Sequence, residues 1–375
     1  IPTNYSNASI GLSLFDLEAD IGETTDVADK NPEVVARLTK LADSLRPLPR
    51  LNAPEGRRAL SRLTQKVAHS GGWLEDQLGR PLAGVTFVGK DGYFVTKASE
   101  VLRLEQCLLR PQPGEEGLAV REVRRDVKLD LVLGQAIGGN NRPHHVTPVT
   151  WAPSVNAKLG QWLVAPALTP LEDGQEGVPN FDLRLGVVSA ARRAIPGMGP
   201  ALGITGRPVE QGLQITEVAE ESPARAAGVR ANDILLEVQG QPAPSIPRIN
   251  EIIRKHQPGD EIQIKLLRRE KPIEKTVRLA SRSRVVANWE GDDYANGGIS
   301  IRTDDFPEVL QHDLPLNLHD MGGPVFDLDG RAIAVNIARA DRITTFALPM
   351  ESFREKLEGW LEADRHPPAA KKAAE

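Results

Sequence analysis

The stretch that decides the fold runs from Leu310 to Ile337 and reads LQHDLPLNLHDMGGPVFDLDGRAIAVNI. Its centre holds Gly322-Gly323-Pro324, and the residues from Val325 to Asn336 form the next predicted strand. Gly-Gly and Gly-Pro runs mark turns in many folds, so a plain turn between two strands is one interpretation. The length over which the pattern continues on both sides favours a more specific one.

The stretch resembles the nucleophile loop of trypsin-like serine proteases, in the version found in the HtrA/Deg family. That loop reads Gly-Asn/Asp-Ser-Gly-Gly-Pro. Six residues of this chain stand where the family pattern requires them: Gln311, Asp313, Asn317, Gly322, Gly323 and Pro324. The nucleophile position, however, is Met321. The residue two before it, usually a glycine whose amide helps to form the oxyanion hole, is His319.

Both substitutions remove chemistry that serine proteolysis needs. A thioether has no proton to lose and cannot form an acyl-enzyme, so Met321 closes the covalent route. Replacing the glycine by His319 is expected to disturb the backbone amides that must point at the developing negative charge. The resemblance therefore predicts a recognisable loop that has lost its catalytic function.

The other two triad positions are found by extending the same resemblance. Residues 84–88 and 93–96 form a predicted hairpin around an Asp-Gly turn, which resembles the family's hairpin before the catalytic histidine. The base position that follows is Ser99, which cannot accept a proton at neutral pH as imidazole can. Asp130 remains at the position of the third triad member. Without a histidine to orient, we expect it to be a hydrogen-bonded or exposed carboxylate at a strand end.

A second module is expected near residues 195–282. Its Leu202-Gly203-Ile204 run, the Ser-Pro-Ala segment at 222–224 and the Asn-Asp-Ile segment at 232–234 resemble a PDZ domain of the HtrA type. The resemblance implies that backbone amides of the Leu-Gly-Ile loop grip a peptide's terminal carboxylate. A helix over residues 246–256 would form the other wall of the groove. The residues expected to bind peptide are Leu202, Gly203, Ile204, Ile249 and Ile253, whereas Ile252 is expected in the core.

Composition limits the other classes of function. The length of 375 residues predicts two or three domains. The 46 basic and 51 acidic residues give a net charge of −5, so nucleic acid is not an expected partner. No apolar run is long enough to span a membrane. The single Cys107 excludes an internal disulfide framework and a cysteine-rich zinc site, and it is expected in a barrel strand over residues 102–109. No cofactor or metal is expected, because neither the pair His144 and His145 nor the spacing of His312, Asp313, His319 and Asp320 specifies ligand geometry.

The predicted fold class is mainly β. It consists of a trypsin-like double β-barrel, an inserted PDZ-like α+β domain and an N-terminal strand-helix segment. The expected divisions are 1–50 as an N-terminal segment and linker, 55–194 as the first part of the barrel, 195–282 as the PDZ-like domain, 283–364 as the second part of the barrel with a final helix, and 365–375 as a disordered tail. A barrel strand is expected at 297–302. In the HtrA/Deg family the PDZ domain usually follows the completed barrel, so an insertion departs from the family pattern.

The N-terminal segment carries a different resemblance. Residues 10–46 are similar to the C-terminal tail of sulfatases, with a helix that begins near Pro32, and Pro47, Pro49 and Pro54 mark a linker. The Cys/Ser-x-Pro-x-Arg motif of sulfatases is absent from the sequence. The chain begins at Ile1 without a signal peptide, so we expect that a segment upstream was removed or left out.

Three functions stay open on the sequence. The first is a pseudoprotease scaffold whose PDZ-like domain captures C-terminal or extended peptide segments and which could form a homo-oligomer. The second is a serine endopeptidase with a rearranged active site that uses Ser99 or His319. The third is an accessory region of a sulfatase-linked protein. The families resembled imply a periplasmic or secreted location.

Overall fold

The computed structural model describes residues 27–45, 54–169, 180–220, 222–286, 298–341 and 343–367. The chain divides into two units, residues 1–62 and 63–375, which are described separately. In the first unit, the 3-10 turn η1 (Ala28–Lys30) precedes helix α1 (Pro32–Leu45). The helix begins at Pro32 as predicted, because proline fits the first helical position. Residues 10–26 of the sulfatase-like segment and the linker prolines Pro47 and Pro49 lie outside the described residues.

Helix α2 (Pro54–Val67) was not predicted from the sequence. Pro54, interpreted above as a linker residue, is its first residue, where a missing amide proton costs nothing. In the second unit, the end of this helix buries Leu63 and Val67 in a cluster with Val164 and Phe326. The last turn of α2, from Leu63 to Val67, therefore packs on barrel strands of the same unit.

Six strands of the second unit close into a first barrel in the order β1-β2-β3-β6-β5-β4. Their bounds are β1 (Gly71–Glu75), β2 (Pro81–Phe87), β3 (Tyr93–Lys97), β4 (Leu108–Arg110), β5 (Leu118–Asp126) and β6 (Leu131–Ile137), with the 3-10 turns η2 (Leu104–Gln106), η3 (Gly139–Asn141) and η4 (Ser154–Asn156) around them. The predicted hairpin is β2 and β3, in which Thr86 lies opposite Val95. Cys107 is not in a strand: its amide closes the η2 turn on the Leu104 carbonyl at 2.9 Å, and β4 begins one residue later.

A second closed barrel has the strand order β17-β20-β19-β18-β7-β8. Its strands are β7 (Trp162–Thr169), β8 (Asn180–Ile195), β17 (Phe306–His312), β18 (Pro324–Phe326), β19 (Ala332–Arg339) and β20 (Thr345–Pro349). The strand predicted at 297–302 is wrong for the residues described there. Ser300 and Ile301 each share one backbone hydrogen bond with a different segment, at Arg339 and Ser281, so no ladder forms.

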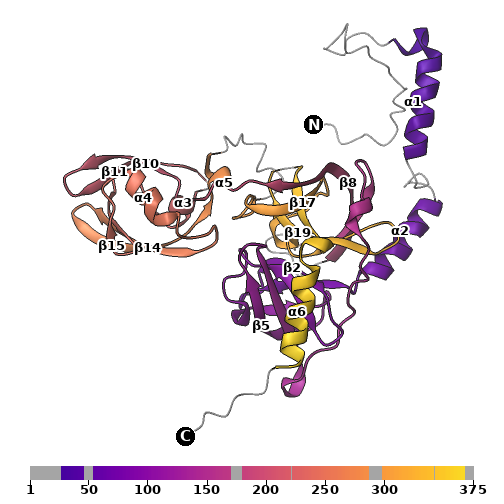
Figure 1. Ribbon diagram of the computed structural model, residues 1–375, viewed down its shortest axis with the longest axis horizontal. Coiled ribbons are helices and arrows are strands. Elements are labelled where there is room, and N and C mark those ends of the chain that lie inside the picture. The colour runs from indigo at the N-terminus through magenta and orange to yellow at the C-terminus, as the bar shows by residue number, and fades with distance from the viewer. Residues whose placement is uncertain are drawn as a thin grey trace. The chain divides into compact units, whose positions relative to one another are not determined.

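The last helix in the described part of the chain packs against both barrels. The turn η7 (Met350–Ser352) leads into α6 (Arg354–Arg365), which runs beside β5 in Figure 1. Leu357 and Leu361 on this helix are buried with residues of both barrels. Arg365, expected to begin the disordered tail, still belongs to α6 and pairs with Asp91 at 2.8 Å. Residues 368–375 lie outside the described part of the chain.

The inserted domain lies between β8 and β17 in the sequence and therefore interrupts the second barrel. Its elements are β9 (Pro200–Ala201), β10 (Ile204–Val209), β11 (Gly212–Val218), α3 (Pro223–Ala226), β12 (Ile234–Val238), β13 (Gln241–Pro242), α4 (Ile246–Ile253), β14 (Glu261–Arg268), β15 (Lys271–Arg278), β16 (Ala280–Ser281) and α5 (Arg282–Val286). The main sheet has the order β10-β11-β12-β14-β15, and Figure 1 shows α3 and α4 packed with it. A separate apolar core holds it together, and the pairing of β16 with β9 joins its two ends.

Candidate functional site

The nucleophile position faces the core of the second barrel. Met321 is 0% exposed and packs in an apolar cluster with Leu163, Leu310 and Val325. Its carbonyl accepts a hydrogen bond from the Gly84 amide at 2.9 Å, which ties the loop to the first barrel. A side chain at this position meets other core side chains and not a solvent-accessible cleft.

The backbone of the same loop is folded into a 3-10 turn, η6 (Leu318–Asp320). Asn317 and Asp320 cap it reciprocally, and the amide of Met321 donates to the Leu318 carbonyl at 3.1 Å. An oxyanion hole requires amides that point at the substrate carbonyl, but the Met321 amide already has a partner inside the turn. The loop therefore lacks one of the two donors that its resemblance implies.

His319 and Asp320 serve the same turn. His319 Nε2 donates to the Leu168 carbonyl at 3.0 Å, which places the proton of a neutral ring on Nε2. Asp320 accepts hydrogen bonds from the amides of Leu168 and Asn317 at 2.9 and 2.7 Å. Burial raises the pKa of Asp320, and the nearby His319 opposes that rise. Both side chains fix the loop against β7.

Little space is left against this loop. The cavity beside His319 and Pro324 measures about 10 Å³, room for no more than a single water molecule. Trp73 and Phe181 close it with an edge-to-face contact whose ring centroids lie 5.2 Å apart. Among the described residues, this cavity is too small to admit a peptide side chain.

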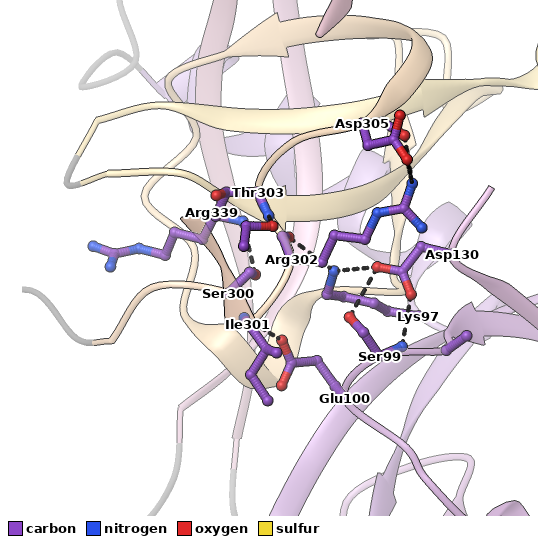
Figure 2. A network of polar contacts seen from close by, with 12 residues as sticks. Lys97, Ser99, Glu100, Asp130, Ser300, Ile301, Arg302, Thr303, Asp305 and Arg339 are labelled. Atoms are coloured by element: carbon purple, nitrogen blue, oxygen red, sulfur yellow. Dashed lines mark hydrogen bonds and ion pairs between the residues drawn. The ribbon is translucent and has the colours of Figure 1, made fainter. Parts of the chain in front are cut away.

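The base position and the third triad position are in direct contact, as Figure 2 shows. Asp130 accepts two hydrogen bonds from Ser99, from the amide at 2.7 Å and from Oγ at 2.8 Å. Lys97 Nζ lies 2.6 Å from the same carboxylate, and the side chains of Lys97 and Asp130 are 0% and 4% exposed. Asp130 is therefore a buried member of an ion pair. An exposed position, one of the two alternatives predicted for it, is wrong.

Arg302 completes this network from the other side (Figure 2). Its backbone carbonyl accepts a hydrogen bond from Lys97 at 3.2 Å, and its guanidinium donates to the carbonyls of Val127 and Lys128 in the turn that leads to Asp130. The guanidinium also lies 4.7 Å from the centre of the Phe306 ring. Neither Lys97 nor Arg302 was a predicted site residue, since a lone cation in the sequence gives no signal that it will be buried.

Two other side chains that could take part in catalysis, those of His312 and Cys107, are buried. His312 is fully buried, and its Nδ1 accepts from the Leu314 amide while Nε2 bonds Asn336 Oδ1 at 2.9 Å. Burial lowers the pKa of His312 to about 4, so the ring is neutral at pH 7. Burial raises the pKa of the Cys107 thiol to about 11, which leaves it unreactive. Within the described ranges, no three His, Cys, Asp or Glu side chains gather to hold a metal ion.

The inserted domain contains a larger cavity, of about 300 Å³. All five residues expected to bind peptide line it: Leu202, Gly203, Ile204, Ile249 and Ile253. Ile252 lies in the core of the domain and not on the cavity. Gly203 has a φ of +78°, and a Cβ there would lie 2.3 Å from the Ser222 Cβ, so the loop conformation requires glycine.

The sheet beside this cavity ends on an edge strand. In the described part of the domain, β10 pairs with β11 on one side only, and α4 stands across the cavity from it. An extended peptide could add to that edge as a further strand, held by main-chain hydrogen bonds and by pockets for alternate side chains. The arrangement can therefore bind a peptide without any chemical step.

The inserted domain and part of the barrel resemble known proteins. Residues 200–279 match the model of the family described as "PDZ domain". The chain is 34% identical over 79 residues to "Serine protease Do-like HtrA" of Bacillus subtilis (strain 168), a match that covers 21% of this chain and 18% of that protein.

A longer match, 24% identical over 262 residues, is to "Probable periplasmic serine endoprotease DegP-like" of Halomonas elongata. It covers 50% of this chain and 54% of that protein. The chain thus spans between about a fifth and about half of the length of these curated relatives. Among solved structures, "Crystal structure of Deg5" is similar at 17% identity and a TM-score of 0.40, covering 81% of this chain and 94% of that one.

Proposed function

We propose that this HtrA-type protein with a PDZ domain binds C-terminal or extended segments of other proteins, on a double barrel that no longer cleaves them. The main observation that supports the proposal is the difference in volume between two cavities. The groove between β10 and α4 has about 300 Å³ for a ligand, whereas the space against the former nucleophile loop has about 10 Å³. Among the described residues, space for a bound peptide therefore lies in the inserted domain, and almost none lies beside Met321.

The loss of catalysis is supported at each step of the reaction. Met321 offers no nucleophile and is buried. Ser99 donates its hydroxyl hydrogen bond to Asp130, and Lys97 neutralises that carboxylate, so neither can act as an imidazole-like base. The Met321 amide, which would bind an oxyanion, is bonded to Leu318. A single reversion is therefore insufficient to restore a triad.

The proposal also covers partners and location. The partners are protein C-termini or unfolded segments, recognised by main-chain pairing with β10 and by the apolar wall of α4. No helix among the described residues is long and apolar enough to cross a membrane. Because the relative from Halomonas elongata is described as periplasmic, we propose that this protein also acts outside the cytoplasm, in the periplasm or after secretion.

The test is hydrolysis of an unfolded, fluorescently quenched casein by the purified chain and by a Met321→Ser variant. Each is assayed with and without an added peptide that has a hydrophobic C-terminus. We expect no release of fluorescence from either protein under either condition. Cleavage that survives repurification and disappears in Ser99→Ala or His319→Ala would overturn the proposal and favour the rearranged endopeptidase.

A further inference from the structure

Helix α5 (Arg282–Val286) lies at one end of the groove between β10 and α4. It follows residues 200–279, which match the PDZ model, so it is not part of the matched domain. Two of its residues, Arg282 and Val285, nevertheless line the groove cavity. A Cβ built on Gly203 would lie 3.0 Å from Val285 Cγ1, so α5 packs directly on the loop that precedes β10. The helix therefore occupies space at the end of the groove.

An extended peptide on β10 would meet this helix. A strand that adds to the edge of the sheet runs along β10 (Ile204–Val209), and the end of that strand nearest Gly203 is the end that α5 covers. The helix reaches this place because β16 pairs with β9, just before the loop, and leads directly into α5. A peptide that fills the groove as far as Gly203 must therefore displace Val285 from its contact with the loop.

Polar contacts on two sides hold α5 in this position. Inside the groove, Arg282 Nη2 donates to Asn250 Oδ1 on α4 at 3.0 Å. Outside it, Ser283 Oγ donates to Asp304 Oδ2 at 2.9 Å. A helix of five residues has little stability of its own, so its position depends on such contacts. Ser283 does not line the cavity, so its hydroxyl affects a bound peptide only through the position of α5.

The contact with Asp304 contains an unsatisfied group. The side chain of Asp304 is buried, and its Oδ2 accepts from Ser283 Oγ and from the Met198 amide, the latter at 3.1 Å. Its Oδ1 is buried and has no hydrogen-bond partner among the described residues. A buried carboxylate oxygen without a donor costs free energy. Water that replaces Ser283 when α5 moves away can solvate the carboxylate, so this cost favours displacement of the helix.

We propose that α5 is an autoinhibitory lid on the peptide groove. In the free protein it covers the end of the groove at Gly203, and a bound peptide keeps it displaced. The apparent affinity for a peptide is then the intrinsic affinity multiplied by the fraction of molecules in which α5 is displaced. This inference rests on the proposed peptide binding and adds its regulation: a change that weakens the contact between Ser283 and Asp304 raises the affinity.

The first test compares the peptide affinity of the intact chain with that of Ser283→Ala. Fluorescein-labelled short peptides with randomised residues before a C-terminal valine are passed over the immobilised chains, and the most strongly retained sequence is titrated by anisotropy. We expect Ser283→Ala to bind it at least about fivefold more tightly, because the variant lacks the hydroxyl that holds α5 in place. The matched control Thr276→Ala removes an exposed hydroxyl that bonds Gln263 outside the cavity, and it should leave the affinity unchanged.

Hydrogen–deuterium exchange of the unmodified chain tests the displacement directly. With α5 in place, the Arg282 amide donates to the Gly199 carbonyl at 2.7 Å. We expect a saturating amount of the same peptide to speed exchange over residues 282–286 and to slow it in β10. This measurement stands even where Ser283→Ala does not fold.

The outcomes separate this inference from the proposed function. Unchanged or weaker binding by Ser283→Ala would overturn the inference while peptide binding stands, as would slower or unchanged exchange over residues 282–286, or an equal gain in Thr276→Ala. Retention of a peptide by Ser283→Ala alone would support the lid. Retention of none by either chain would overturn the proposed function as well.

Discussion

Replacing Asp130 with asparagine is expected to destabilise the first barrel strongly. The carboxylate is paired with Lys97 Nζ at 2.6 Å, and both side chains are almost inaccessible to water. Asparagine keeps the shape and leaves Lys97 as an uncompensated charge in the interior. Removing one partner of a buried ion pair costs about 3–5 kcal/mol of the free energy of unfolding. That is a large part of the 5–15 kcal/mol that typically holds a domain folded.

The assay is urea unfolding followed by tryptophan fluorescence. Residues 200–279 contain no tryptophan, so this signal reports the other parts of the chain, including Trp73 in β1. The matched control is Arg331→Gln, which breaks an ion pair whose arginine side chain is 48% exposed and is expected to cost at most about 1 kcal/mol. The double variant Lys97→Met/Asp130→Asn is expected to recover at least half of the loss, because it removes the uncompensated charge while the asparagine Oδ1 still accepts from the Ser99 amide and tolerates the positive φ of 57° at position 130.

The reasoning is refuted if Asp130→Asn costs no more than Arg331→Gln. In that case the carboxylate would not be the structural partner of Lys97, and a role in chemistry would again have to be considered. A double variant that is less stable than Asp130→Asn alone would contradict the explanation in terms of an uncompensated charge.

Three further predictions follow from other parts of the structure. Met321→Ser is expected to lower the free energy of unfolding by about 2–5 kcal/mol, since it leaves a cavity and a hydroxyl in the core. Met321→Leu is expected to cost less than about 1.5 kcal/mol, and urea unfolding measures the difference between the two variants. Stability is expected to fall by about 2 kcal/mol between pH 7 and pH 5. The reason is that His312 takes up a proton near pH 6.5 in the unfolded state, whereas its pKa of about 4 keeps it neutral in the folded state. His312→Gln should reduce the dependence of stability on pH between pH 7 and pH 5. An unchanged dependence would contradict the explanation by His312. Gly203→Ala is expected to weaken binding of C-terminal peptides at least tenfold in an anisotropy titration, whereas Gly240→Ala, also at positive φ but with no atom within 4 Å of the new Cβ, should leave affinity unchanged.

The parts of the structure that depend on local sequence could be predicted. The hairpin of β2 and β3 follows from two β-rich runs around an Asp-Gly turn, and α4 follows from isoleucines at helical spacing. The loop residues Leu202 and Gly203 were expected beside the same groove because their run resembles the peptide-binding loop of a PDZ domain, where a glycine lets the backbone approach the ligand closely. In each case the signal and the structure lie within a few residues of each other.

The parts that depend on distant partners could not be predicted. Lys97 is a cation in a strand, and its burial depends on Asp130 and on the carbonyl of Arg302, more than 200 residues further along the chain. The position of Arg282 beside the groove was missed for the same reason, because it depends on the pairing of β16 with β9. Pro54 was assigned to a linker, although proline is equally suited to the first position of a helix.

The central claim is that this chain binds peptides and does not cleave them, and one sample can test both halves. A fluorescein-labelled peptide with a hydrophobic C-terminus is incubated overnight with the intact chain, and its anisotropy and mass are recorded together. The account predicts a saturable rise in anisotropy with the peptide mass unchanged. Accumulation of peptide fragments that stops when Ser99 is replaced by alanine would contradict it.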